Sequence, residues 1–238
     1  MPTLGEADRD QLLAEQREYY RARAGEYDEW WRRQGRYDHG MDARRRWQDE
    51  VTAVERALDA FAPSGDVLEL ASGTGWWTER LAGHAATLAC VDASREVIAI
   101  NRARLAEAGH APARYLEADL FRWRPDRKYD VVFFSFWLSH VPPERFEEFW
   151  AIVAEALRPH GRAFLIDSCR DTTSGARDHH QPVEAGLQER RLNDGRTFRI
   201  VKLFYEPDLL AARLRQLGWR AEMHRTENYF IYGSAERL

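Results

Sequence analysis

The sequence has few cysteines and no long hydrophobic run. Its two cysteines, Cys90 and Cys169, form no Cys-x-x-Cys pair and lie near no histidine cluster of metal-ligand spacing, so we expect both to be reduced and buried. No apolar run approaches the roughly 20 residues that span a bilayer, and residues 1–16 lack the apolar core of a signal peptide. We therefore expect a cytoplasmic protein that does not bind membranes.

An excess of positive charge is also missing. The formal net charge is −4 and the isoelectric point is near 6.1, which argues against a general nucleic-acid binder, because such proteins neutralise phosphates. Hydrophobic residues make up 44% of the chain, enough to bury a sizeable core. Apolar residues in the N-terminal helices and the terminal strands are candidates for a homodimer contact.

The order of apolar segments indicates an α/β protein. Residues 1–62 have helical periodicity, which predicts two helices. This region is expected to form an N-terminal cap. Residues 63–238 alternate short apolar runs with amphipathic ones, which is typical of a parallel sheet with helices on both faces. A polar insertion is expected at about 169–205, as a lid, a binding loop or a disordered excursion. The runs WRAEMHR and NYFIYGSAE are expected to form a terminal hairpin.

The segment VLELASGTGWW is the most informative stretch. A buried strand runs into Gly73 and Gly75, a tight turn that lets a ligand approach the backbone. The dinucleotide fingerprint G-x-G-x-x-G would need a third glycine where Thr78 stands, which weakens an NAD-dependent oxidoreductase as the alternative function.

The motif E-L-A-S-G-T-G, with acids ending the second and third strands at Asp92 and Asp119, resembles class I S-adenosylmethionine (SAM)-dependent methyltransferases. The resemblance extends from about Asp66 to Asp167. It implies a Rossmann-like, mainly parallel seven-stranded sheet, SAM as cofactor and methyl transfer as the activity. A protein that binds SAM without catalysis is a further alternative.

The resemblance also implies roles for particular residues. Asp92 would accept from both ribose hydroxyls, Asp119 from the adenine amine, and Glu69 would organise the glycine loop. On the residues alone, Asp92 could instead cap a helix, Asp119 could stabilise a turn and Glu69 could form a buried salt bridge. The other expected cofactor contacts are Tyr20, Ala71, Ser72, Gly73, Gly75, Ala93, Leu120, Phe121 and Ser135.

The fourth strand is followed by FWLSH, which brings His140 to the sheet edge where Asp92 and Asp119 are expected. The segment SFWL differs from the D/N-P-P-Y motif of N6-adenine methyltransferases, which favours a small-molecule acceptor. His140 is the best-placed general base, although it could equally pack against the cofactor. Tyr20, Arg23 and Tyr27 share a helix face, and Tyr27 is a second catalytic candidate.

The expected acceptor is a small molecule methylated on oxygen, at a hydroxyl, carboxylate or phosphonate, rather than on nitrogen or carbon. Arg199 and Lys202 lie within an apolar extended run, where a buried cation needs a partner, and guanidinium pairs well with carboxylate or phosphonate. Trp137 is the third expected substrate contact. The adjacent His179 and His180 suggest a metal, but neighbouring side chains rarely meet at one ion, so no metal site is expected.

Overall fold

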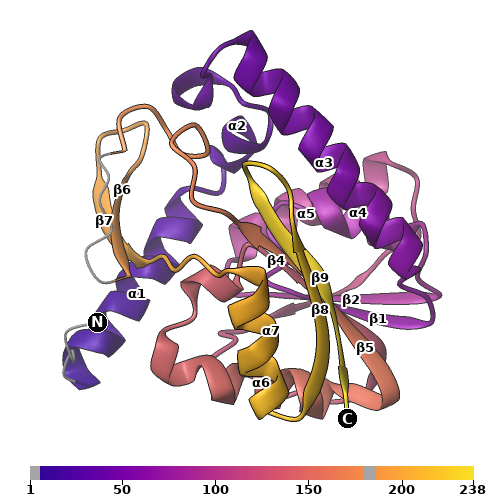
Figure 1. The fold of residues 1–238 in the computed structure, drawn as a ribbon. Helices are drawn as coiled ribbons and strands as arrows, with labels where there is room; N and C mark the ends of the chain where they lie inside the picture. The colour runs from indigo at the N-terminus through magenta and orange to yellow at the C-terminus, as the bar shows by residue number, and fades with distance from the viewer. Residues whose placement is uncertain (1–5, 180–185) are drawn as a thin grey trace.

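A computed structural model describes residues 6–179 and 186–238, and its centre is a seven-stranded sheet (Figure 1). Five strands are parallel, and the last two pair antiparallel at one side, as the sequence predicts. From edge to edge the order is β3 (Arg114–Glu117), β2 (Thr87–Asp92), β1 (Asp66–Leu70), β4 (Tyr129–Ser135), β5 (Leu157–Ser168), β9 (Phe230–Arg237) and β8 (Trp219–Arg225). The Rossmann-like fold class is confirmed.

Helices cover both faces of this sheet (Figure 1). The helices are α1 (Glu6–Ala22), α2 (Tyr27–Trp31), α3 (Met41–Phe61), α4 (Trp76–Ala82), α5 (Arg95–Glu107), α6 (Phe146–Ala156) and α7 (Pro207–Gln216), with 3₁₀ turns η1 (Gly35–Tyr37), η2 (Leu138–His140) and η3 (Pro143–Arg145). Among the described residues, no helix is both long and apolar enough to cross a membrane.

The two faces of the sheet bury alternate residues of each strand. Val67 and Val131 pack with α3 and α4, whereas Leu68 and Val132 pack with α6 and α7. Burial on both faces explains why these strands read as continuous apolar runs. The helix α3, which lies within the expected cap region, packs along the sheet, because its buried residues recur at helical spacing: Ala43, Trp47, Val51, Val54 and Leu58.

The N-terminal region differs from the two predicted helices. The first helix ends at Ala22 rather than running toward Gly35, and a turn at residues 23–26 leads into the short α2. Gly25 lies in that turn, where its low helix propensity favours an interruption. The turn directs α2 across the glycine loop instead of away from it.

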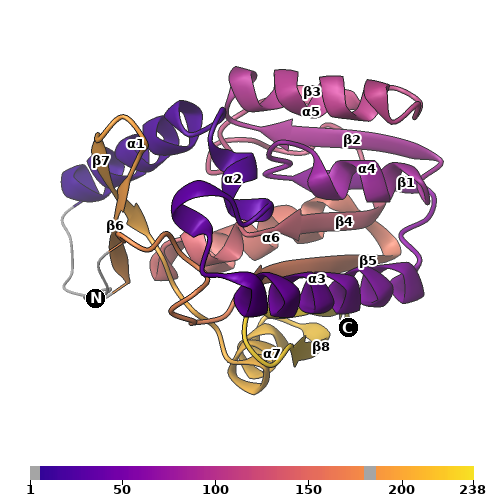
Figure 2. The same ribbon diagram turned by 90° about the horizontal axis from the view of Figure 1, so that it is seen from above.

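The excursion after β5 forms a second, two-stranded sheet beside α1. Strands β6 (Leu187–Arg191) and β7 (Thr197–Val201) pair antiparallel, and both views place this hairpin next to α1, away from the main sheet (Figures 1 and 2). Tyr19 packs there against Leu192 and Ile200. His180 and the rest of 180–185 lie outside the described residues.

Candidate functional site

The glycine loop between β1 and α4 is held open from beneath by one amide. Gly73 and Gly75 have φ angles of +55° and +94°. Asn101 of α5 donates from its Nδ2 to the carbonyls of Ser72 and Gly73, at 3.3 and 3.2 Å. These contacts fix the loop from its carbonyl side, while the Ser72 N–H donates to the Val91 carbonyl at 3.2 Å.

Thr78 takes the place of the third fingerprint glycine, and its hydroxyl is part of a buried polar network. It donates to the Glu69 carboxylate and accepts from Asn101 at 2.8 Å, while the Cys90 thiol also faces Glu69. Burial raises the pKa of Glu69 to about 8. Glu69 thus has ordered partners for its Oε2, while its buried Oε1 has no hydrogen-bond partner among the described residues. The side chain lies below the loop rather than in a cavity.

Asp92 ends β2 and faces a cavity of about 100 Å³, here called the sheet-edge cavity. Its two carboxylate oxygens accept from the backbone N–H groups of Gly73 and Ser94, each at 3.0 Å. Burial raises the pKa of the Asp92 carboxyl, although these N–H groups act in the opposite direction. The helix cap is Ser94, whose hydroxyl accepts from Val97, so the capping role considered for Asp92 belongs to its neighbour.

Asp119 also lines the sheet-edge cavity. One of its oxygens accepts from the backbone N–H of Phe121 at 3.0 Å, and the other binds Arg17 of α1 at 3.1 Å. Trp137, expected to contact substrate, lies beside Phe121 with ring centroids 5.3 Å apart. The predicted residues that line this cavity together are Tyr20, Tyr27, Ala71, Gly73, Asp92, Ala93, Asp119, Leu120, Phe121, Ser135, Trp137 and His140.

Ser72 and Gly75, the remaining predicted loop residues, line a small hollow of about 20 Å³ under α2 that also borders Gly73. The loop is joined to α2 there by Asp28, which accepts from the Thr74 hydroxyl and from the indole of Trp76, each at 2.9 Å. This role of Asp28 could not be predicted from the sequence, because the two elements that it joins are far apart along the chain.

His140 is buried and has both ring nitrogens engaged. Its Nδ1 lies 2.6 Å from the carbonyl of Val201, which can only accept, so this nitrogen carries the proton. Its Nε2 lies 2.6 Å from the Tyr20 hydroxyl and therefore accepts from it. Burial and the charge of Lys202 hold the pKa of His140 well below its usual value, so the ring is neutral and its lone pair is directed at Tyr20.

A second cavity of about 430 Å³, here called the basic cavity, adjoins the first. The two share Tyr20, Tyr27, Phe136 and His140. The cationic side chains that line the basic cavity are Arg23, Arg177, Arg190 and Lys202, and its histidines are His39, His140 and His179. Of the lining residues that the structure describes, Asp171 supplies the carboxylate, so positive charge is in excess.

Arg23 is the most unusual of these cations. It is 8% exposed, and within the described part of the chain no carboxylate forms an ion pair with it. Its guanidinium lies 4.9 Å from the ring centroid of Tyr27 and 5.6 Å from that of Tyr37, and its Nε has no hydrogen-bond partner. A buried guanidinium of this kind is costly unless an anion joins it.

Lys202 and Arg199, the two expected substrate-binding cations, lie in different surroundings. Lys202 is buried in the basic cavity, where its Nζ donates to the Ser139 hydroxyl at 2.8 Å and lies 3.6 Å from Asp167. Burial lowers the pKa of Lys202 to about 8. Arg199 is exposed on β7 and pairs with Glu15 of α1 at 3.0 Å, outside the cavity.

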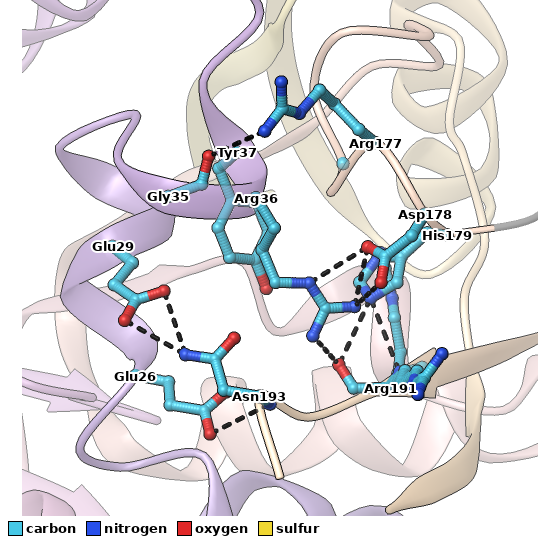
Figure 3. A network of polar contacts seen from close by, with 12 residues as sticks. Glu26, Glu29, Gly35, Arg36, Tyr37, Arg177, Asp178, His179, Arg191 and Asn193 are labelled. Atoms are coloured by element: carbon cyan, nitrogen blue, oxygen red, sulfur yellow. Dashed lines mark hydrogen bonds and ion pairs between the residues drawn. The ribbon is translucent and has the colours of Figure 1, made fainter. Parts of the chain in front are cut away.

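The outer wall of the basic cavity is fastened to the N-terminal helices (Figure 3). Arg36 donates to both carboxylate oxygens of Asp178, at 3.0 and 2.9 Å, and to the carbonyl of Arg191 at 2.6 Å. At the hairpin tip, the Asn193 amide donates to Glu29 of α2 at 3.0 Å. The wall is thus positioned by polar contacts between segments more than 130 residues apart.

Comparisons with known proteins agree with this geometry. A family described as methyltransferase domain matches residues 67–161. The structure is similar to DhpI bound to S-adenosylhomocysteine (SAH), with 37% identity, a TM-score of 0.77, and coverage of 95% of this chain and 97% of that chain. It is similar to the complex of DhpI, SAM and HEP, with 38% identity, a TM-score of 0.77, and coverage of 94% and 97%.

More distant structures share the fold alone. Magnesium protoporphyrin IX methyltransferase (ChlM) from Synechocystis PCC 6803 with bound SAM has 19% identity and a TM-score of 0.59, over 93% of this chain and 95% of that one. No significant match is found among curated protein sequences. Because the identity with DhpI extends over nearly the whole of both chains, this protein belongs to the SAM-dependent methyltransferases of the class I fold, enzymes that take SAM as their cofactor.

Proposed function

We propose that the enzyme transfers the methyl group of SAM to an oxygen of a small acidic acceptor bound in the basic cavity. The observation that carries this proposal is Arg23, a buried guanidinium that lines the cavity without a carboxylate partner among the described residues. An acid group would supply the missing anion, and a guanidinium can hold two of its oxygens at once.

The cofactor fits the sheet-edge cavity by its donor set. Asp92 would accept from the ribose hydroxyls, and Asp119 from the adenine amine beside the backbone N–H of Leu120. The loop at Gly73 would hold the methionine end, with Gly75 and Ser72 behind it and Glu69 supporting it from below. The ring of Phe121 and the backbone of Ala71, Ala93 and Ser135 complete the lining.

The residues shared by the two cavities define where transfer would occur. SAM supplies a methyl group that is already activated on a sulfonium, so the protein has mainly to align the acceptor. A deprotonated acid oxygen gains the methyl group as the C–O bond forms and the C–S bond breaks, and no proton has to leave. With an acid as acceptor, His140 therefore need not act as a base; we propose that it orients the Tyr20 hydroxyl at the junction, with Tyr27 opposite.

DhpI, which shares 38% identity with this chain, forms a complex with both SAM and HEP, and this supports a site that binds a second ligand beside the cofactor. A methylation assay tests the proposal directly. Purified enzyme and methyl-labelled SAM are incubated with carboxylates and phosphonates, and in parallel with alcohols and amines of matched size. We expect label in the esters of acids; turnover of amines or neutral alcohols without turnover of any acid would refute the proposed function.

Asp92→Asn is expected to weaken SAH binding about 10- to 100-fold. A hydrogen bond to a charged group contributes about 1.5–3 kcal/mol, and the amide offers one accepting oxygen where the carboxylate offers two. Calorimetric titration with SAH measures the change. Asp126→Asn, at an exposed acid that pairs with Arg114, is the matched control, and equal SAH affinity in both variants would remove Asp92 from the cofactor site.

The pH dependence of acceptor use is set by Lys202. Its pKa is lowered to about 8 by burial, so the cation is present below that pH and is lost as the pH rises through it. We expect kcat/KM for an acidic acceptor to fall above about pH 8, because this parameter reports groups of the free enzyme. In Lys202→Met the value should be lower and this descending limb absent; a limb that persists would have to come from another group.

A further inference from the structure

The basic cavity contains one buried acceptor atom that the proposed function leaves unused. Gln188 lies on β6, is 3% exposed and lines the cavity. Its backbone pairs with Ile200 in the hairpin, but its side-chain Oε1 has no hydrogen-bond partner among the described residues. A buried polar atom without a partner is uncommon in folded proteins, and this one belongs to a side chain that lines a ligand cavity.

The position of Gln188 separates it from the groups that would hold the acid. Alternate residues of a strand share a face, so Gln188 and Arg190 present their side chains to the same cavity. Arg190 donates to His179 at 2.6 Å, which fixes it against the outer wall. Gln188 therefore meets a part of the acceptor that lies toward β6, while Arg23 lies in the turn after α1 and Lys202 follows β7 at the base of the hairpin.

The charged side chains that line this cavity are mostly hydrogen-bond donors. Arg23, Arg190 and Lys202 can only donate, and the carboxylate of Asp171 already accepts from the backbone N–H and hydroxyl of Thr173, at 2.7 and 2.6 Å. The amide oxygen of Gln188 is thus the group most in need of a donor. An uncharged donor satisfies it best, since an ammonium group would be repelled by the surrounding cations.

We propose that Gln188 selects acidic acceptors that also carry an uncharged O–H or N–H donor, such as a hydroxyl or amide group, and discriminates against bare acids and against acids with an ammonium group. This inference rests on the proposed function. A bare acid would leave the amide oxygen unpaired, and a site built to bind a donor rejects analogues that lack it.

Matched acids of equal size test this selectivity. Glycolate, propionate and glycine form one series, and hydroxymethylphosphonate, ethylphosphonate and aminomethylphosphonate form another. In the wild type we expect kcat/KM for the hydroxy acid to exceed that for the other two by about tenfold, or about 1.4 kcal/mol. In Gln188→Leu the hydroxy-to-bare ratio should fall to about one, with the bare acid used at least as well as before.

Gln216→Leu, at an exposed position of α7, is the control and should keep the wild-type ratio. Gln188→Glu provides a second variant, which should shift preference toward the ammonium acid. Titration with SAH verifies that each variant retains its cofactor site. A wild-type ratio near one, or a tenfold ratio that persists in Gln188→Leu, would overturn the role of Gln188.

Failure of this inference differs from failure of the proposed function. If acids are methylated without preference, the proposed function stands and the selectivity is wrong. If no acid is methylated, the proposed function fails, and binding of the same acids to the SAH complex, measured by calorimetry, still decides the inference. A preference in binding that disappears in Gln188→Leu would support it, and equal or absent binding would overturn it.

Discussion

Arg23→Met is expected to lower kcat/KM for an acidic acceptor by about 100-fold or more. Removing one partner of a buried charge pair costs about 3 kcal/mol or more, because the other charge is left in a desolvated site. Methionine keeps the unbranched shape among the tyrosine rings, so packing of the turn after α1 should change little. Steady-state kinetics at saturating SAM measure the effect, and SAH affinity should stay within a few fold.

Two further variants separate charge from position in this experiment. Arg23→Lys retains a cation but loses the planar fork, so it should recover only part of the activity. Arg21→Met removes an arginine two residues away that is 61% exposed and pairs with Glu96, and it should have near wild-type kinetics. If Arg23→Met retains acceptor turnover within a few fold, the guanidinium does not hold the acid, and the proposed acceptor class loses its main support.

Much of the fold could be predicted from sequence because burial on both faces leaves a direct signature. Runs such as VLEL and YDVVFF lack a regular alternation of apolar and polar residues, and the structure buries them between two helical layers. The terminal hairpin was also correctly placed. The turn at residues 23–26 was missed, since a short helix after a glycine has too few turns to show a periodicity of its own.

Residues of the site could be predicted from the sequence where they directly follow a strand. Asp92 and Asp119 follow strands whose carboxyl ends meet at one edge, so their order along the chain indicates their proximity. Arg199 and Lys202 could not be separated, because which one enters the cavity depends on how the hairpin packs against α1. Asn101 did leave a signal that was overlooked: it is a polar residue on the buried face of a helix.

Gly75→Ala is expected to destabilise the fold by about 3 kcal/mol and lower Tm by roughly 6–12 °C. At φ +94° any side chain is strained, and a Cβ there would lie 2.8 Å from the Asn101 side chain and 3.1 Å from its Cα. Asn101 cannot retreat cheaply, since its amide holds the Ser72 carbonyl and the Thr78 hydroxyl. Thermal unfolding without ligand measures the loss.

Gly73→Ala is expected to weaken cofactor binding much more than it lowers the stability of the fold. Its φ of +55° is strained by the same rule, but a Cβ would meet nothing closer than the Ala71 carbonyl at 4.0 Å, so we expect a loss of only about 1 kcal/mol. The space it fills is where the methionine end of SAM is proposed to lie, so SAH affinity should fall at least tenfold. Gly25→Ala, with an unstrained φ and open space, is the neutral control. If Gly73→Ala binds SAH normally while Gly75→Ala unfolds, the loop is structural support and the cofactor must lie elsewhere along the sheet edge.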